Sequence, residues 1–320
     1  MFNLDFSPDR EKNPLILQRA DPFIYKHTDG YYYFTASVPE YDRIELRRAW
    51  TLEGLANAEP AVIWRKHSDG PMSWHIWAPE IHFIDGKWYI YFAAGQVHDP
   101  WYIRTWILEN SSQDPFCGEW KEKGRLEAEW DSFMLDTTVF THKGSLYAVW
   151  AQKSKERTEN SRLYIAQMYN PYTLKLPQTL LSVPEYDWEC NGFKVNEGPA
   201  VLIRNRKVFI TFSASATDAS YCIGLLYADE NADLLNPVSW KKAKKPVFTT
   251  DESFGIFGPG HNSFTVTHDG KDDVLVYHAR PYAEVNLDMA LYDPNRNTLI
   301  KRILWDKNGF PVLQKNSPVL

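Results

Sequence analysis

Four side chains that could transfer protons precede alternating apolar segments at nearly regular intervals. Asp21, Asp136 and Glu197 supply carboxylates, and His261 supplies an imidazole. With Ala78 as the equivalent residue of one further segment, these positions are separated by 57, 58, 61 and 64 residues. Carboxylates brought together repel one another, which raises the pKa of at least one and separates a proton donor from a proton acceptor. The spacing therefore predicts acid–base chemistry, with ordinary turn formation as the alternative for each single acid.

The segments that must position these side chains form an internal repeat. Residues 20–37, 77–95, 135–152, 196–215 and 260–280 share one pattern. Each has an alternating apolar run, a turn containing Gly or Asn, and a second apolar run. This pattern is typical of a β-hairpin, so the sequence predicts five hairpins in succession.

Repeat units of 57 to 64 residues suit a four-stranded sheet with its loops. Radial repetition of such sheets around a channel gives a β-propeller, whereas a β-sandwich would show shorter turn spacing. We therefore expect an all-β fold, a single five-bladed β-propeller over residues 1–320. The first strand of each blade should line the channel, so its first residues should converge at one end. Residues 43–55 are compatible with either a helix or a strand and loop.

Five motifs resemble those of glycoside hydrolase family 43. They are RADPFIYKHTDGYYYFTAS, HIWAPEIHFIDGKWYIYFAAG, MLDTTVF, NEGPAV and GPGHNSF, and in this order they cover essentially the whole chain. The resemblance implies a five-bladed propeller that hydrolyses glycosides with inversion at the anomeric carbon. The stretches YDRIELRRA and WAPEIHFIDGKWYIYF are most similar to exo-acting α-1,5-L-arabinofuranosidases. The implied substrates are arabinan and arabino-oligosaccharides.

The resemblance also implies a role for each acid. Asp21 matches the general base, which deprotonates the attacking water, and Glu197 matches the general acid, which protonates the leaving oxygen. Asp136 matches a third acid that raises the pKa of the general acid and orients it. His261 matches a channel histidine near a central, water-coordinated cation, often calcium, with a buried, hydrogen-bonded histidine as the alternative. The chemistry itself requires no cofactor.

Two further residues are candidates, with His261, for contact with the sugar. Trp77 could line the pocket, although aromatic residues also fill the core of β proteins. Arg280, in YHARPY, could bind a sugar hydroxyl or hold a carboxylate in its charged form. A structural salt bridge is the alternative for Arg280.

Composition limits which binding partners and which cellular compartment we expect for this protein. The net charge is −6, and the longest basic cluster is KKAKK at 241–245, so we expect no nucleic acid partner. No stretch approaches the ~18 consecutive apolar residues of a membrane span. The N-terminal residues lack the apolar region of a signal peptide, so we expect a cytoplasmic protein, or a secreted one if a leader was removed. Three widely spaced cysteines give neither a disulfide framework nor a zinc site, and nothing indicates the oligomeric state.

Other functions are compatible with the same scaffold. A β-xylosidase or an endo-arabinanase of the family would share the acids and differ in the loops around the pocket. A non-catalytic carbohydrate-binding or protein-interaction propeller would not need three acids at strand starts. The fructoside-cleaving family 32 is disfavoured because NDPNG and RDP are absent. Since five blades use nearly all of the chain, we expect arabinan-derived soluble oligosaccharides as substrates.

Overall fold

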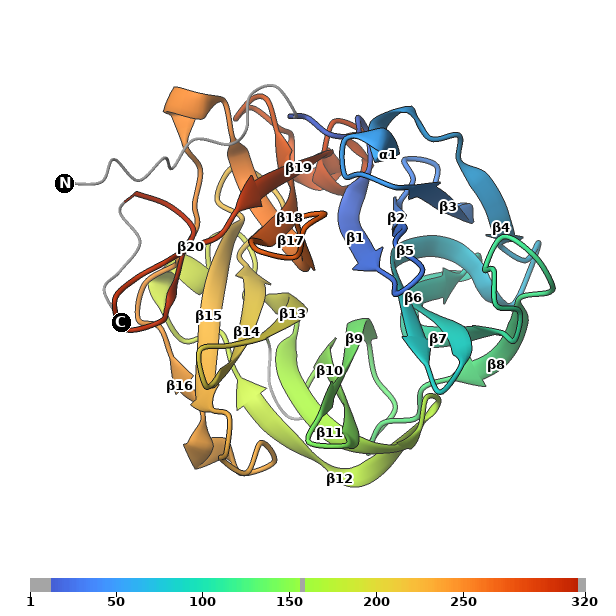
Figure 1. Cartoon of the computed structure of the whole chain (residues 1–320), viewed down its shortest axis with the longest axis horizontal. Helices are drawn as coiled ribbons and strands as arrows, with labels where there is room; N and C mark the ends of the chain where they lie inside the picture. The colour runs from blue at the N-terminus through green and yellow to red at the C-terminus, as the bar shows by residue number, and fades with distance from the viewer. Residues whose placement is uncertain (1–12, 156–158, 316–320) are drawn as a thin grey trace.

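The computed structural model describes residues 13–155 and 159–315 and shows five antiparallel sheets arranged around a common axis (Figure 1). The first strand of each sheet lies nearest the axis, where it contacts the first strands of other sheets. The predicted five-bladed β-propeller is therefore confirmed. Both ends of the chain lie outside the described residues, so a single domain over residues 1–320 stays a prediction.

The strands of each blade follow one another along the chain. The five blades comprise β1 (Ala20–Lys26), β2 (Tyr32–Ser37), β3 (Arg43–Ala49) and β4 (Ala61–Arg65); β5 (Pro71–Ile84), β6 (Lys87–Gln96), β7 (Asp99–Asn110) and β8 (Lys121–Arg125); β9 (Met134–His142), β10 (Ser145–Gln152), β11 (Arg162–Asn170) and β12 (Thr173–Ser182); β13 (Asn196–Arg204), β14 (Lys207–Ala214), β15 (Cys222–Asp229) and β16 (Lys241–Lys242); and β17 (Phe257–Val266), β18 (Asp273–Arg280) and β19 (Asn297–Arg302).

Short elements connect and flank the blades. They are α1 (Gly54–Asn57), the 3-10 helices η1 (Asp187–Glu189), η2 (Pro237–Ser239), η3 (Glu252–Phe254) and η4 (Leu287–Tyr292), and a hairpin of β20 (Leu304–Trp305) and β21 (Pro311–Val312). The stretch 43–55 is thus mostly strand, and α1 begins near its end. No helix among the described residues is long and apolar enough to cross a membrane.

Turn chemistry fixes three of the predicted hairpins. Their two-residue loops have positive φ at both residues, which is the type I′ conformation that matches the twist of the flanking strands. The loops are Asp85-Gly86, Lys143-Gly144 and Asn205-Arg206. A tight loop sets the register of the two strands, so in these three blades it fixes which residues of the innermost and second strands pair.

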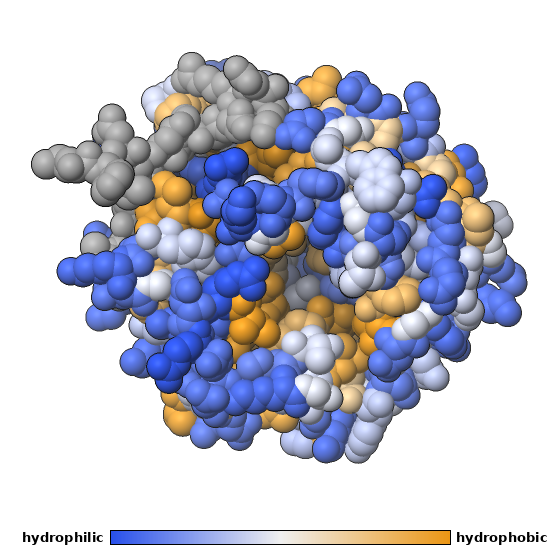
Figure 2. Space-filling model, in the orientation of Figure 1, coloured by the Kyte–Doolittle hydropathy of each residue, from blue (hydrophilic) through white to orange (hydrophobic). Residues whose placement is uncertain are grey.

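The hydrophobic core lies between adjacent blades. Between the second and third blades, Tyr91 of β6 packs with Trp150 of β10 and Tyr164 of β11. Middle strands such as β6 and β14 are buried along most of their length, so their sequences are nearly continuous apolar runs. Figure 2 shows that the face in view is hollowed near the centre of the ring, with apolar residues inside the hollow.

The ring is closed by hydrogen bonds between its first and last parts. Ile16 forms an antiparallel bridge with Thr298 of β19, and the Thr298 amide donates to the Ile16 carbonyl at 2.9 Å. The Asn13 side chain exchanges two bonds of 2.7 Å with the backbone of Ile300. Blade five therefore takes its outer edge from residues 13–16. We call this junction of residues 13–16 with β19 the seam.

Candidate active site

Each innermost strand carries a β-bulge at the same place. The ladder to the second strand skips residues 21–22, 78–79, 136–137, 198–199 and 261–262. The first residue of every pair has a left-handed φ between 42 and 54°. A bulge bends its strand and redirects the side chains around it. Here the bulges direct side chains of all five blades toward one end of the axis.

The residue types at the bulges fit this backbone. The left-handed region admits Gly without strain and is enriched in Asp, Asn and His among other residues. The five left-handed residues are Asp21, Ala78, Asp136, Gly198 and His261. Three of them are followed by proline, whose missing N–H costs nothing where the ladder is already broken.

The bulges correct the sequence alignment of blade four. Backbone geometry pairs Gly198, not Glu197, with Asp21, so the alignment is wrong by one residue in that blade. Glu197 occupies the position before the bulge, which Trp77 fills in blade two. Both positions contribute to the same pocket, so Glu197 still joins the other acids.

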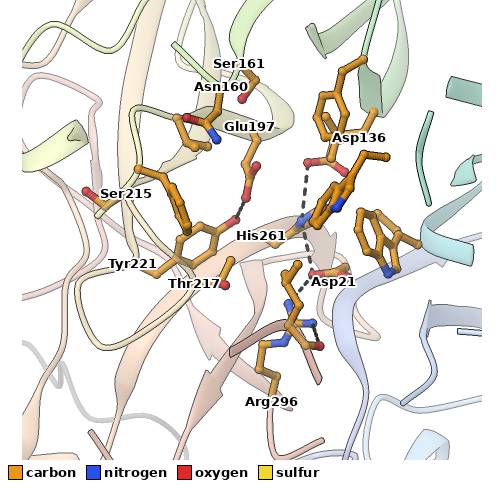
Figure 3. A pocket seen from close by; sticks show the side chains of 18 of the residues that line it. Asp21, Asp136, Asn160, Ser161, Glu197, Ser215, Thr217, Tyr221, His261 and Arg296 are labelled. Carbon is orange, nitrogen blue, oxygen red and sulfur yellow. Dashed lines mark hydrogen bonds and ion pairs between the residues drawn. The ribbon is translucent and has the colours of Figure 1, made fainter. Parts of the chain in front are cut away.

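A pocket of about 440 Å³ lies at this end of the axis, within the usual size of small-ligand sites. It brings together five of the six residues predicted from the sequence. They are Asp21, Trp77, Asp136, Glu197 and His261. Figure 3 labels four of them, the three acids and His261.

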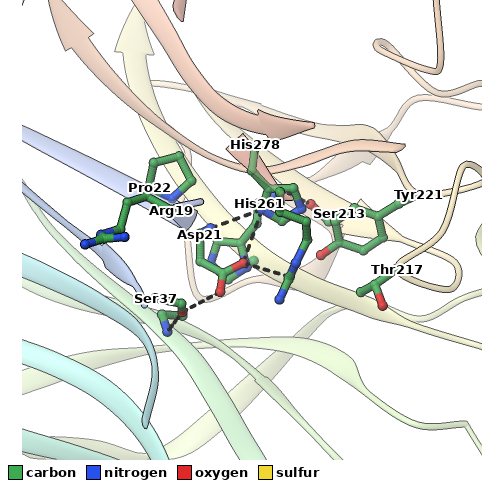
Figure 4. Close-up of polar contacts among 12 residues, drawn as sticks. Arg19, Asp21, Pro22, Ser37, Ser213, Thr217, Tyr221, His261 and His278 are labelled. Carbon is green, nitrogen blue, oxygen red and sulfur yellow. Dashed lines mark hydrogen bonds and ion pairs between the residues drawn. The ribbon is translucent and has the colours of Figure 1, made fainter. Parts of the chain in front are cut away.

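Asp21 is buried and held from several sides (Figure 4). Its Oδ2 accepts a hydrogen bond from the Ser37 hydroxyl at 2.6 Å, and its amide donates to Nδ1 of His278 at 3.0 Å. Its Oδ1 lies 3.4 Å from Nδ1 of His261 and 3.5 Å from Nη1 of Arg296. Burial alone would raise the pKa of Asp21, but the charges of His261 and Arg296 outweigh it and hold that pKa well below its ordinary value. Asp21 therefore stays ionised and can accept a proton.

His261 lies between two carboxylates. Its Nδ1 is 3.4 Å from Oδ1 of Asp21 and 3.9 Å from Oδ2 of Asp136. Although burial lowers the pKa of His261, the three acids Asp136, Asp21 and Glu197 raise it above its ordinary value. Burial raises the pKa of Asp136, with His261 opposing and Asp21 adding to the rise. Asp136 also accepts a 3.0 Å hydrogen bond from the amide of Gly198.

Glu197 has the opposite surroundings to Asp21. Its Oε1 accepts a 2.8 Å hydrogen bond from the hydroxyl of Tyr221. Burial, and then the charge of Asp136, raise the pKa of Glu197 to about 8, with Tyr221 opposing the rise. Glu197 therefore stays protonated near neutral pH and can donate a proton. Asp21 and Glu197 thus have the two protonation states that an acid–base pair needs.

An aromatic wall runs from the acids toward the mouth of the pocket. Trp77 stacks on His75, with ring centroids 4.2 Å apart, and its centroid lies 6.1 Å from that of Trp101. Trp77 is buried, whereas Trp101 is 57% exposed and Phe193, elsewhere in the pocket lining, is 45% exposed. The exposed part of the lining thus includes the apolar side chains of Trp101 and Phe193 together with the acid Asp288.

The structure places Arg280 outside the pocket lining. Its Nη1 and Nη2 donate to the carbonyls of Thr217 and Ala290, both at 2.6 Å, and its Nε lies 3.7 Å from Oδ2 of Asp293. Arg280 thereby ties the β14–β15 loop to the β18–β19 loop. These are structural contacts, which were the alternative for Arg280 from the sequence.

Sequence reasoning missed four residues that contact the acids. They are Ser37, Tyr221, His278 and Arg296. No sequence motif links any of these residues to the acid that it contacts. One signal was available, because β18 alternates with a period of two and places His278 on the same face as Arg280.

Within residues 13–155 and 159–315, no group of three or more His, Cys, Asp or Glu side chains is placed to hold a metal ion. Calcium takes 6–8 oxygen ligands, whereas His261 turns Nδ1 toward two carboxylates that it pairs with directly. These residues do not fit a directly ligated calcium ion. The water-coordinated cation implied by the resemblance stays a prediction.

Fold and pocket together describe a five-bladed β-propeller with an acid–base set of carboxylates at one end of its axis. Comparison with known proteins agrees with that class. The chain belongs to glycosyl hydrolases family 43, whose model matches residues 11–311.

Two curated relatives are more than half identical to this chain. The extracellular exo-α-(1→5)-L-arabinofuranosidase of Streptomyces avermitilis is 55% identical over 299 residues, covering 93% of this chain and 62% of the relative. The protein of the same name from Streptomyces chartreusis is 56% identical over 278 residues, covering 87% and 85%. A crystal structure of α-L-arabinofuranosidase from Lactobacillus brevis, 54% identical, superimposes with a TM-score of 0.91 and 96% coverage of both chains. The chain thus spans less than two thirds of the Streptomyces avermitilis relative.

These relatives overturn one expectation. The charged N-terminal residues predicted a cytoplasmic protein, but both Streptomyces relatives are named extracellular, so that prediction is wrong. Secretory leaders are removed from mature proteins, and the composition of N-terminal residues therefore does not decide the compartment.

Proposed function

We propose that this chain is an inverting exo-acting glycoside hydrolase that releases L-arabinofuranose from α-1,5-linked arabinan and arabino-oligosaccharides. The observation that carries the proposal is the placement of an ionised Asp21 and a protonated Glu197 in one pocket. A non-catalytic binding module would have no need of this difference in protonation. Family membership and the names of the relatives support the substrate class.

The reaction requires only side chains and water. Asp21 takes a proton from a water molecule as the water oxygen bonds to the anomeric carbon. Glu197 gives its proton to the glycosidic oxygen as the bond between that oxygen and the anomeric carbon breaks. Since water attacks the face opposite the leaving group, the configuration inverts. Both carboxyl groups then return to their starting states by exchanging protons with solvent.

Asp136 supports the acid in two ways. Its negative charge helps to raise the pKa of Glu197, which keeps the donor protonated. Its Oδ2 also accepts from the amide of Gly198, the residue that follows the acid. Asp136 therefore fits the predicted role of raising the pKa of the general acid and orienting it.

Exo-action and a sugar leaving group are supported by the pocket lining. The long β18–β19 loop contributes Leu287, Leu291 and Arg296 to the lining, so it covers part of the pocket and favours binding of a chain end. Trp101 and Phe193 offer apolar surface where the pocket reaches solvent. The apolar face of a second sugar would pack against that surface.

Substitution of the two acids tests the proposal. We expect Asp21→Asn and Glu197→Gln each to lower kcat on α-1,5-arabinotriose by at least about 100-fold, because each removes one proton transfer. Glu119→Gln removes an exposed acid on the surface and should keep wild-type activity. Product analysis should show arabinose released one unit at a time, with the β-anomer appearing first by NMR.

Several outcomes would contradict the proposal. Wild-type protein inactive on every arabinoside would refute the hydrolase. Release of xylose from xylo-oligosaccharides without release of arabinose would identify a xylosidase instead, and longer oligosaccharides appearing first from arabinan would indicate endo-action. An α-anomer appearing first would refute inversion.

A further inference from the structure

The hydroxyl of Tyr221 is bonded to only one of the two oxygens of Glu197. It donates to Oε1 at 2.8 Å (Figure 3). Tyr221 is 1% exposed and precedes β15, in the same blade as Glu197. An acid that delivers a proton to a leaving group needs one oxygen directed at that group. The contact therefore distinguishes the two oxygens of the acid.

The ring of Tyr221 is fixed by a neighbour that also contacts the base. It stacks on His278 of β18, with centroids 5.7 Å apart and planes 6° apart. Nδ1 of the same His278 accepts the hydrogen bond from the amide of Asp21 (Figure 4). Tyr221 and His278 thus form one rigid connection between the acid and the base, which come from different blades.

Two glycines of β17 make room for this tyrosine. A β-carbon on Gly260 would lie 2.2 Å from Cε1 of Tyr221, and one on Gly258 would lie 2.1 Å from the carbonyl oxygen of Asp218. Asp218 accepts a 3.2 Å hydrogen bond from the Tyr221 amide and so belongs to the turn that presents the ring. The Gly-Pro-Gly sequence before His261 is therefore a requirement for placing Tyr221 against the acid.

We propose that Tyr221 is a positioning residue that occupies Oε1 of Glu197, so that Oε2 carries the proton and delivers it to the leaving oxygen. This inference rests on the proposed function and assigns the donor oxygen within it. The bond between Oε2 and its proton breaks as the proton passes to the glycosidic oxygen, and that oxygen leaves the anomeric carbon. The tyrosine keeps its own proton, because burial and then the charge of Glu197 hold the pKa of Tyr221 well above its ordinary value.

The hydrogen bond gains strength as the reaction proceeds. When Glu197 loses its proton, the Tyr221 bond becomes charge-assisted and therefore stronger. The other charged groups facing Glu197 are Asp136, Asp21 and His261, and the first two oppose its ionisation. Tyr221 is thus the neighbour that both orients the acid and stabilises its carboxylate.

The leaving group provides the first test. A sugar leaving group needs a proton, whereas 2,4-dinitrophenolate leaves without one. We expect Tyr221→Phe to lower kcat/KM about tenfold on α-1,5-arabinotriose and less than about twofold on 2,4-dinitrophenyl α-L-arabinofuranoside, because only the first depends on the acid. Tyr277→Phe is the matched control, since Tyr277 is also fully buried and its hydroxyl has no hydrogen-bond partner among the described residues. It should change neither rate.

The pH profile provides the second test. Removing a donor to a carboxylate raises its pKa, so the basic limb of kcat/KM on arabinotriose should move upward by about one pH unit in Tyr221→Phe. Equal losses on both substrates, or an unmoved basic limb, would overturn the inference and leave Tyr221 a packing residue. Should Tyr221→Phe fail to fold, Gly260→Ala displaces the same ring and should give the same difference between substrates. Wild-type protein inactive on both substrates would instead refute the proposed hydrolase.

Discussion

At the scale of residues, three carboxyl groups in one pocket differ because their neighbours differ. Asp21 has His261 and Arg296 close to one oxygen and the Ser37 hydroxyl on the other. Glu197 has no such cation at ion-pair distance among the described residues. A base with a low pKa still suffices, because water attacking an oxocarbenium-like carbon becomes acidic as its bond forms. The low pKa ensures that the base is ionised at every working pH.

The raised pKa of Glu197 leads to a prediction about pH. The donor must be protonated, so kcat/KM should hold at acidic to neutral pH and fall as pH rises through about 8. Asp136→Asn removes a negative charge that helps to keep the proton on Glu197. The basic limb of the kcat/KM profile of Asp136→Asn should therefore move to lower pH. This direction is opposite to that expected for Tyr221→Phe. A limb that stays in place or moves upward in Asp136→Asn would contradict the electrostatic role of Asp136.

The sequence was sufficient to find the acids but not their supports. Asp21 and Asp136 occur at one phase of a repeat, and Glu197 lies one residue from it. His278 contacts Asp21 across 257 residues of sequence, and Tyr221 is one of 18 tyrosines. Contacts of this kind depend on how blades meet, and no local pattern encodes that.

At the scale of elements, the β-bulge explains both the success and the error of the alignment. The apolar alternation that follows the bulge is the same in every blade, but it does not say which of two adjacent residues is left-handed. In blade four, Pro199 marks the bulge in the sequence, because a proline also follows the left-handed residue in Asp21-Pro22 and Ala78-Pro79. Aligning the prolines would have placed Gly198 opposite Asp21.

The bulges lead to a pair of predictions of opposite sign. A β-carbon on Gly198 would lie 3.1 Å from Cγ of His261, at a φ of 52°. We expect Gly198→Ala to lower the free energy of unfolding by about 1–3 kcal/mol and to reduce activity. Ala78→Gly relieves the same strained conformation and keeps the hydrogen bond that the amide of residue 78 donates to the Ser37 hydroxyl. Its free energy of unfolding should therefore rise by up to about 1 kcal/mol. Urea unfolding measures both, and a larger loss in Ala78→Gly than in Gly198→Ala would contradict this account.

At the scale of the whole molecule, the repeat predicted the blades but not how the ring closes. Five similar segments are visible because each hairpin is local. The seam joins residues near the two ends of the chain, and neither side of it belongs to the repeat. The β18–β19 loop, which brings Arg296 to Asp21, likewise lies outside the five repeated segments.

Two neighbouring residues test the contribution of the seam to stability. Ile16 is 4% exposed and packs in the core beside β1 and β19, whereas Leu17 is 64% exposed. We expect Ile16→Ala to lower the free energy of unfolding by about 2–4 kcal/mol. Leu17→Ala should stay within about 0.5 kcal/mol of wild type. If thermal or urea unfolding shows a loss for Ile16→Ala as small as that expected for Leu17→Ala, the seam contributes little to stability.

Asp21 lies where the two ends of the ring meet, and this has a consequence for biosynthesis. The ribosome makes the base before its partners His278 and Arg296, which follow it by 257 and 275 residues. An incomplete nascent chain would hold all three acids and still lack the contacts that fix the base. Hydrolytic activity should therefore appear only once the fifth blade has been translated and has docked, which makes turnover a reporter of completed folding.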